Sequence, residues 1–89
     1  MNRWTELRTA YYVAKLGTVS AAADALQIHR ATVLRHVEAL EAELGGVLFH
    51  RHARGYTPTE AGRDLLRIGA ATADQFAQLA GRTRGRAAD

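Results

Sequence analysis

Residues 29–43 read HRATVLRHVEALEAE, and this stretch predicts the helix around which the rest of the chain is organised. Its apolar residues recur at steps of four, three and four, which is the spacing of one helix face. The residues of this face are Val33, Val37, Leu40 and Leu44. The remaining positions are mostly polar, so the pattern predicts an amphipathic helix that lies on a core.

The charges on this helix follow an unusual order, with basic side chains in its first half and acids in its second half. The basic residues are His29, Arg30, Arg35 and His36, and the acids are Glu38, Glu41 and Glu43. This order opposes the helix dipole, by about 0.3–1 kcal/mol for each badly placed charge in the end turns. A polyanion against the first half would be attracted by the arginines and by the helix amino end together. The alternative is a solvated face whose charge order has no function.

Length and composition limit the possible classes of protein. The chain has 89 residues, 47% of them apolar, which predicts one small folded domain. Eleven of the twelve Lys and Arg residues are arginine, whose planar fork matches phosphate and guanine, and the pI of about 10 favours a nucleic-acid partner. There is no cysteine and no long apolar run, so we expect a cytoplasmic location, no membrane contact and no signal peptide.

Two shorter helices are predicted before residue 29. The first runs from about Trp4 to Leu16, with Trp4 and the tyrosines as core or rim residues, and ends at Gly17. The second runs from about Val19 to Leu26 and is capped by Thr18. Only Gln27 and Ile28 then remain before the third helix, and so short a connection predicts a helix-turn-helix.

A small hairpin, or wing, is predicted after Gly45 and Gly46 end the third helix. Its strands are Val47–Arg51 and Tyr56–Thr57, joined by a turn over residues 52–55. There is no acid from residue 45 to residue 59, whereas two arginines and two histidines are present. A basic hairpin beside a helix-turn-helix can enter a minor groove. The alternative is an ordinary solvated loop.

Thr59 and Glu60 predict the start of a last helix, which should run to about Ala80. Two apolar stripes with heptad-like spacing run along it, and they predict a two-fold homodimer through this helix. The expected contact residues are Leu65, Leu66, Ala70, Ala73, Phe76, Ala77, Leu79 and Ala80. The alternatives are packing on its own domain or fraying. We therefore expect a helix-turn-helix domain over residues 1–58, a linker helix over 59–80 and a flexible tail or linker over 81–89.

Short motifs keep a fixed spacing along most of the chain. They are Gly17-Thr18, Ala22-Ala23 with Leu26, Arg35, Leu40-Glu41 with Leu44-Gly45, Leu48-Phe49 with Arg51, and Thr59 with Gly62. In this order, over about residues 4–80, they resemble the N-terminal DNA-binding domain of LysR-type transcriptional regulators. The resemblance implies a mainly α fold with a small β-hairpin, a winged helix-turn-helix with a long C-terminal linker helix that dimerises antiparallel.

The resemblance also implies sequence-specific binding of a double-stranded DNA operator and control of transcription in a bacterium, without enzyme activity or a cofactor. Full members carry an effector domain, which can bind a small-molecule effector. This chain is then either an excised domain or a stand-alone protein, and a boundary just after a linker helix favours the first. Here His29-Arg30 stands where the family usually has Ser-Gln, and Leu34 stands where it often has serine. Histidine is a poorer helix cap than serine, and arginine favours guanine over adenine. Leu34 can touch a thymine methyl or simply pack.

The expected DNA-binding residues are Thr18, Ser20, His29, Arg30, Thr32, Leu34, Arg35, His36, Arg51 and Arg54. Among them, Arg30, Thr32 and Arg35 should face bases or flanking phosphates in the major groove. Arg54 should reach the minor groove, while Arg51 and the residues at the start of the second helix should hold the DNA backbone.

Three other classes of function remain as alternatives. A metal-responsive module would use His29 with His36, or His50 with His52, but neither pair has a helical spacing of four and no cysteine adds a ligand. An enzyme would need a nucleophile with its base, a phosphate loop or paired carboxylates, and none can be recognised. A winged helix that binds only proteins is disfavoured by the acid-free hairpin and the arginines of the third helix.

Overall fold

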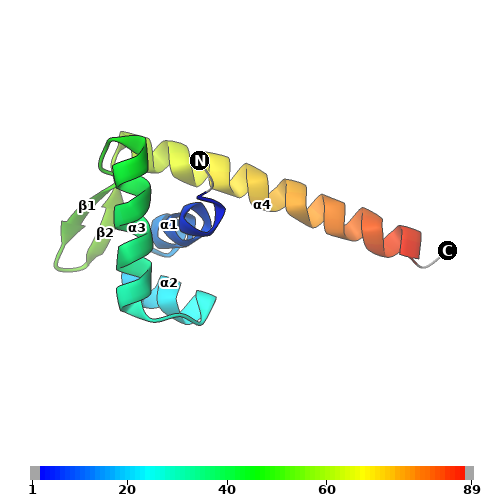
Figure 1. The fold of residues 1–89 in the computed structure, drawn as a ribbon, viewed down its shortest axis with the longest axis horizontal. Coiled ribbons are helices and arrows are strands. Elements are labelled where there is room, and N and C mark those ends of the chain that lie inside the picture. The colour runs from blue at the N-terminus through cyan, green and yellow to red at the C-terminus, as the bar shows by residue number, and fades with distance from the viewer. Residues whose placement is uncertain (1–2, 88–89) are drawn as a thin grey trace.

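The computed structural model describes residues 3–87, which form four helices and one hairpin (Figure 1). The elements are α1 (Trp4–Leu16), α2 (Val19–Leu26), α3 (Arg30–Leu44), β1 (Phe49–His52), β2 (Gly55–Pro58) and α4 (Glu60–Ala87). The two strands pair antiparallel, with Phe49 opposite Pro58 and His52 opposite Gly55. The predicted mainly α fold with a small hairpin, a winged helix-turn-helix, is confirmed.

The helix ends follow the signals in the sequence. The Thr18 hydroxyl accepts a hydrogen bond from the amide of Ala21 at 3.0 Å, and the Thr59 hydroxyl accepts one from the amide of Gly62 at 3.1 Å. Gly45 ends α3 in the left-handed region with φ 76°. Gln27 takes the same conformation with φ 58°, so that the chain reverses between α2 and α3 within the predicted tight turn. Local chemistry therefore decides where these helices start and stop.

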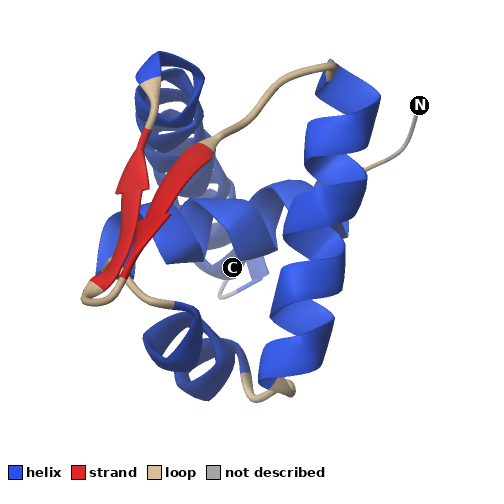
Figure 2. Cartoon of the chain, turned by 90° about the vertical axis from the view of Figure 1, so that its left-hand side faces the viewer, coloured by secondary structure: helices blue, strands red, loops and turns tan. Residues whose placement is uncertain are grey.

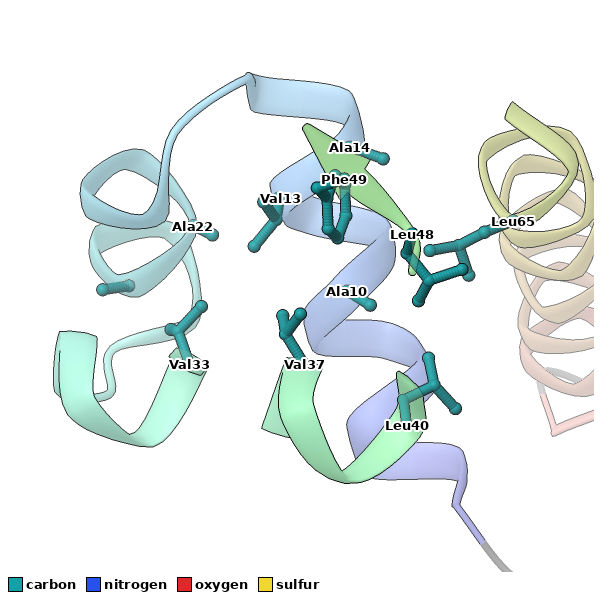
Figure 3. Close-up of a cluster of buried hydrophobic side chains, with 11 residues drawn as sticks. Ala10, Val13, Ala14, Ala22, Val33, Val37, Leu40, Leu48, Phe49 and Leu65 are labelled. Atoms are coloured by element: carbon teal, nitrogen blue, oxygen red, sulfur yellow. The ribbon is translucent and has the colours of Figure 1, made fainter. Parts of the chain in front are cut away.

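The core lies on both sides of α1, with α2 and α3 on one side and α4 on the other (Figure 3). Its buried apolar residues are Ala10, Val13, Ala14, Ala22, Ala23, Val33, Val37, Leu40, Leu48, Phe49 and Leu65. The predicted inner face of α3 is confirmed for three of its four residues, whereas Leu44 is 56% exposed. This core fixes α3 and the hairpin relative to one another through α1.

Trp4 is not a core residue, contrary to the prediction, because 70% of its surface is exposed. The buried face of α1 is centred on Ala10 and Val13 instead. Trp4 and Val13 are nine residues apart, and at about 100° per residue they lie on opposite sides of the helix. Leu7, Tyr11 and Ala14, which follow Trp4 at helical spacing, lie in the core or against it, so Trp4 is the member of this stripe that lies outside.

The hairpin starts later and turns more tightly than predicted. The first strand begins at Phe49 rather than Val47, because the Leu48 amide donates to Glu41 Oε2 at 2.7 Å and the Leu48 carbonyl accepts from the Thr59 amide at 2.9 Å. The turn contains only Ala53 and Arg54, the residues between the paired His52 and Gly55. The amide of Tyr56 then donates to the carbonyl of Gly17 at 2.9 Å, so the hairpin is tied to the loop between α1 and α2.

Glu41 is the side chain that joins α3 to the start of the hairpin. We expect Glu41→Ala to lower the free energy of unfolding by about 1–3 kcal/mol, because the part-buried Leu48 amide loses its acceptor. Urea unfolding followed by circular dichroism measures the change. Glu41→Gln keeps an acceptor oxygen and should recover most of the loss. Equal midpoints for Glu41→Ala and the unaltered chain would show that this hydrogen bond does not stabilise the hairpin.

The last helix is longer than predicted, because α4 runs through Gly81 and Gly85 to Ala87 instead of ending near Ala80. Residues 81–87, for which a flexible tail or linker was expected, are helical in the structure, and residues 88 and 89 lie outside the described residues. Arg84 and Arg86 stand in the last turn, where positive charge complements the helix dipole. The second half of α4 extends away from the other elements, and the molecule measures 51 × 25 × 21 Å (Figure 1).

The first half of α4 packs on its own domain. Leu65 is only 5% exposed and Leu66 packs partly buried against the core, so these two predicted dimer contacts serve the domain itself. Gly69 is buried, and a Cβ there would stand 2.4 Å from Cδ1 of Tyr11. This absence of a side chain lets α1 approach α4 closely. Within the described residues, no helix is both long enough and apolar enough to cross a membrane.

Candidate nucleic-acid interface

One end of the molecule brings together three segments that are far apart in the sequence. Figure 2 shows the start of α2, the start of α3 and the tip of the hairpin on the same side of the molecule, in its lower half. Residues from all three segments line one open groove. The groove is lined by Thr18, Val19, Ser20, Arg30, Leu34, His52, Ala53, Arg54, Gly55 and Tyr56. Five of the ten predicted DNA-binding residues are in this set: Thr18, Ser20, Arg30, Leu34 and, from the wing, Arg54.

The arginines of α3 lie on the surface, as predicted. Arg30 is exposed at the first position of the helix, and its Nη1 donates to Ser20 Oγ at 3.1 Å. Arg35 is exposed, and no hydrogen bond or ion pair holds its guanidinium within the described part of the chain. The ion pairs between residues 3 and 87 join Arg3 to Glu43 and Arg67 to Asp64, so neither α3 arginine is neutralised by the chain's own carboxylates.

Two of the three acids in the second half of α3, Glu41 and Glu43, have internal partners, which refines the interpretation of the charge order. Glu41 accepts from the Leu48 amide, and Glu43 pairs with Arg3 at 3.5 Å. These contacts place negative charge near the carboxyl end of the helix for structural reasons. The basic first half has no acid in its first turn, and from Arg8 to Val37 the sequence holds one acid, Asp24. The first half of α3 is therefore the part whose positive charge an external anion would neutralise.

The other predicted residues of α3 differ in their accessibility. His29 is exposed and makes no side-chain capping hydrogen bond, in agreement with histidine being a poor cap. Thr32 and Leu34 are half-buried. His36 is the exception among them, because its Nδ1 lies 2.9 Å from the hydroxyl of the buried Thr9. That contact turns the ring of His36 towards α1, so we remove His36 from the residues expected to read DNA.

The basic residues of the wing occupy distinct positions. Arg54 is exposed in the two-residue turn, whereas Arg51 lies on β1 with its guanidinium 5.3 Å from the ring centroid of Tyr56. Tyr56 in turn contacts Phe49 of the core edge to face, with ring centroids 5.7 Å apart and the ring planes at 67°. Sequence reasoning did not assign a role to Tyr56. The hairpin register, which pairs Arg51 with Tyr56, was the signal that would have revealed this stacked pair.

The histidines of the hairpin do not form a metal-ligand set with other side chains. His52 Nε2 is within 2.6 Å of the Thr57 hydroxyl across the hairpin. Between residues 3 and 87, no three His, Cys, Asp or Glu side chains come close enough together to hold a metal ion. His29 and His36, the other predicted pair, point to different surroundings, since His29 is exposed and His36 contacts Thr9.

Comparison with family models relates the chain to known proteins. Residues 4–63 match the model described as bacterial regulatory helix-turn-helix protein, lysR family. The transcriptional regulator TcbR of Pseudomonas sp. (strain P51) is 39% identical over 85 residues, which cover 93% of this chain and 28% of that protein. ClcR of Pseudomonas putida is 43% identical over 61 residues, which cover 68% of this chain and 21% of that protein. The chain thus spans less than a third of the length of these regulators.

Solved structures are similar over almost the whole chain. A complex described as CbnR_DBD with DNA superposes with a TM-score of 0.79 at 32% identity and covers 98% of this chain and 99% of that one. A complex described as BenM_DBD with catB site 1 DNA gives a TM-score of 0.87 at 26% identity, covering 100% and 98%. Full-length CbnR superposes with a TM-score of 0.73 at 34% identity, and the match covers 98% of this chain and 28% of that one.

Proposed function

The chain belongs to the lysR family of bacterial regulatory helix-turn-helix proteins, and from that premise we propose that it binds a double-stranded DNA operator and regulates transcription. The observation that supports this most directly is the exposure of Arg30 and Arg35 on the basic half of α3, beside Arg54 at the tip of the wing. Two of the similar structures are complexes with DNA. The site of action would be the bacterial cytoplasm.

In this proposal the first half of α3 enters the major groove. Arg30 and Arg35 present two-bonded forks that match the O6 and N7 acceptors of guanine. Thr32 and Leu34 are half-buried, and Leu34 lines the groove; the two would contact flanking phosphates or a thymine methyl. The exposed His29 lies at the amino end of α3, where the uncapped turn favours an anion.

The remaining contacts would hold the DNA backbone. The hydroxyl of Thr18 is occupied as the α2 cap, so its contribution would come from the helix start that it orders. Ser20 is exposed in the first turn of α2, and Arg51 stands on Tyr56 with its outer donors free to meet a phosphate. Arg54, in the two-residue turn, would reach the neighbouring minor groove.

We further propose that two copies pair through the second half of α4. Phe76 is 70% exposed and Leu79 is 57% exposed, although both are large apolar side chains. They line a shallow groove with Ala80, Thr83 and Arg84, whose surface is mainly apolar. An exposed apolar strip of this kind marks an interaction surface. Of the eight predicted contacts, the six from Ala70 onward stay in the proposal.

A pair of copies would place two α3 helices about one DNA turn apart, roughly 34 Å. The two half-sites would then be related by the two-fold axis of the dimer. The chain spans 28% of the length of TcbR. An effector domain and a small-molecule effector are what the resemblance to LysR-type regulators implies for a full regulator. Those partners belong to the proposal for the whole regulator.

A selection from random duplexes tests the proposed function. The purified chain should enrich one sequence with two-fold symmetry, and its affinity should fall as salt rises, because bound arginines release counterions from phosphate. A duplex with the same composition in scrambled order is the control for non-specific binding. Failure to enrich any sequence, together with no binding at low ionic strength, would refute DNA recognition. Equal binding of all sequences would refute specificity alone.

A further inference from the structure

Arg30 is attached to a second helix by its side chain. Its Nη1 donates to Ser20 Oγ at 3.1 Å, so the guanidinium at the start of α3 is held from the first turn of α2. Both residues are exposed and line the groove that also contains Arg54. Arg35, the other arginine of α3, has no such partner within residues 3–87. The hydrogen bond therefore distinguishes two arginines that the sequence alone presents as equivalent.

We propose that Ser20 is a positioning residue that directs Arg30 at a guanine of the operator, so that α2 takes part in base choice through α3. The inference rests on the proposed function. It names guanine as the base that the protein should prefer at one position of each half-site. It also predicts that the preference depends on a residue that itself touches no base.

The hydrogen-bonding capacity of the two side chains permits this arrangement. A guanidinium has five N–H donors, and a guanine edge takes two of them, at O6 and N7. One further donor of Nη1 can therefore remain on Ser20 while the fork faces the base. The Ser20 hydroxyl accepts that bond with an oxygen lone pair and keeps its own hydrogen for another partner. Adenine offers one acceptor and one donor at the same edge, so the fork is matched less well.

Holding the guanidinium in advance would increase discrimination. An exposed arginine samples many rotamers, and fixing such a side chain on binding has an entropic cost. The hydrogen bond that Arg30 donates to Ser20 restricts the Arg30 side chain before DNA arrives. Arg30 is also the first residue of α3, where neither a side-chain cap from His29 nor an acid in the first turn competes for its donors. The Arg30 guanidinium is therefore restrained by Ser20, and no carboxylate within residues 3–87 neutralises its charge.

A direct phosphate contact is the alternative role for Ser20, and the two roles predict different results. A hydroxyl that binds only a phosphate contributes equally to every sequence. A hydroxyl that positions Arg30 contributes mainly when the base at that site is guanine. The informative measurement is consequently the ratio of affinities for two duplexes that differ at one base pair, rather than either affinity alone.

The experiment uses the whole chain and the duplex enriched by selection. Each guanine of a half-site is changed to adenine in turn, with its paired base, and affinities are measured for the unaltered chain. The preference for guanine over adenine at the position that Arg30 contacts should be about five- to 150-fold in affinity. That position is identified as the one at which Arg30→Ala abolishes the preference. At that position Ser20→Ala should reduce the preference by roughly three- to tenfold, the gain expected from restraining one flexible side chain.

Two further variants make the result decisive. Ser20→Thr keeps a hydroxyl and should restore the preference, whereas Thr5→Ala removes an exposed hydroxyl from α1 and should change nothing. Melting curves establish that each variant folds. A preference that survives Ser20→Ala, with affinity either unchanged or lowered equally for all duplexes, overturns the inference while leaving the proposed function intact. If the unaltered chain enriches no duplex, the proposed function itself fails.

Discussion

Replacing Arg35 with alanine is expected to lower the affinity for the operator by roughly five- to 150-fold, the worth of one two-bonded arginine contact to a base. Arg35 is exposed on α3, directly after the groove residue Leu34, and no carboxylate within the described residues neutralises it. No core contact is removed, so the melting temperature should stay within a degree or two. Fluorescence anisotropy with the selected duplex, alongside thermal unfolding, measures both quantities.

A matched control separates base reading from general charge. Arg67→Ala removes the same charge from α4, where Arg67 is exposed and pairs only with Asp64 at 3.5 Å. This variant should bind nearly as well as the unaltered chain. Arg35→Lys keeps the charge without the fork and should recover non-specific binding but not specificity. Undiminished operator affinity in Arg35→Ala would remove this residue from the proposed interface.

The parts of the fold that were predictable from the sequence are those set by neighbouring residues. Thr18 and Thr59 each accept an amide hydrogen bond from the first turn of the next helix, and Gly45 takes the left-handed conformation that ends α3. These signals act over three or four residues, so no knowledge of the tertiary structure is needed to interpret them. The short connection at Gln27 and Ile28 likewise left room only for a tight turn.

The predictions that differ from the structure concern positions whose structure depends on contacts between residues far apart in the sequence. Trp4 belonged to a plausible stripe, but α2, α3 and α4 cover the faces of α1 that contain Ala10 and Val13. The hairpin starts at Phe49 because Glu41 accepts a hydrogen bond from the amide of Leu48, seven residues later in the chain. The sequence underestimates the length of α4, because residues 81–87 contain no large apolar residue that would predict a helix face. Alanine and arginine favour a helix even without a core to pack on.

The candidate site shows the same division. Exposure of Arg30 and Arg35 followed from helical periodicity, since the apolar face of α3 was identified correctly at Val33 and Val37. The bond from Arg30 to Ser20 and the bond from His36 to Thr9 depend on how three helices meet. No spacing rule within one helix can predict such contacts. The sequence therefore predicts which residue types lie on the polar face of α3. The tertiary structure distinguishes the residues of that face that point outward from those that are hydrogen-bonded to another helix.

Replacing Phe76 with aspartate is expected to have the largest effect on operator binding. In the proposed dimer the exposed ring of Phe76 is buried against a second copy, together with Leu79. An aspartate there would place an unpaired charge in an apolar interface, which is strongly unfavourable. Monomers would then bind each half-site independently, and the gain from joining two sites, about 10²–10⁴-fold, would be lost.

Two measurements and one control test this dimer. Sedimentation equilibrium should give a dimer for the unaltered chain and a monomer for Phe76→Asp, while titrations should show that only the unaltered chain prefers the full operator to an isolated half-site. Gln78→Asp adds the same charge two residues later, at about 200° around the exposed helix, and should leave both properties unchanged. Because Phe76 lies outside the core, the melting of the helix-turn-helix should be affected only through loss of the partner. A Phe76→Asp chain that remains dimeric would show that the copies pair through another surface, and the exposed strip of α4 would then need a different partner.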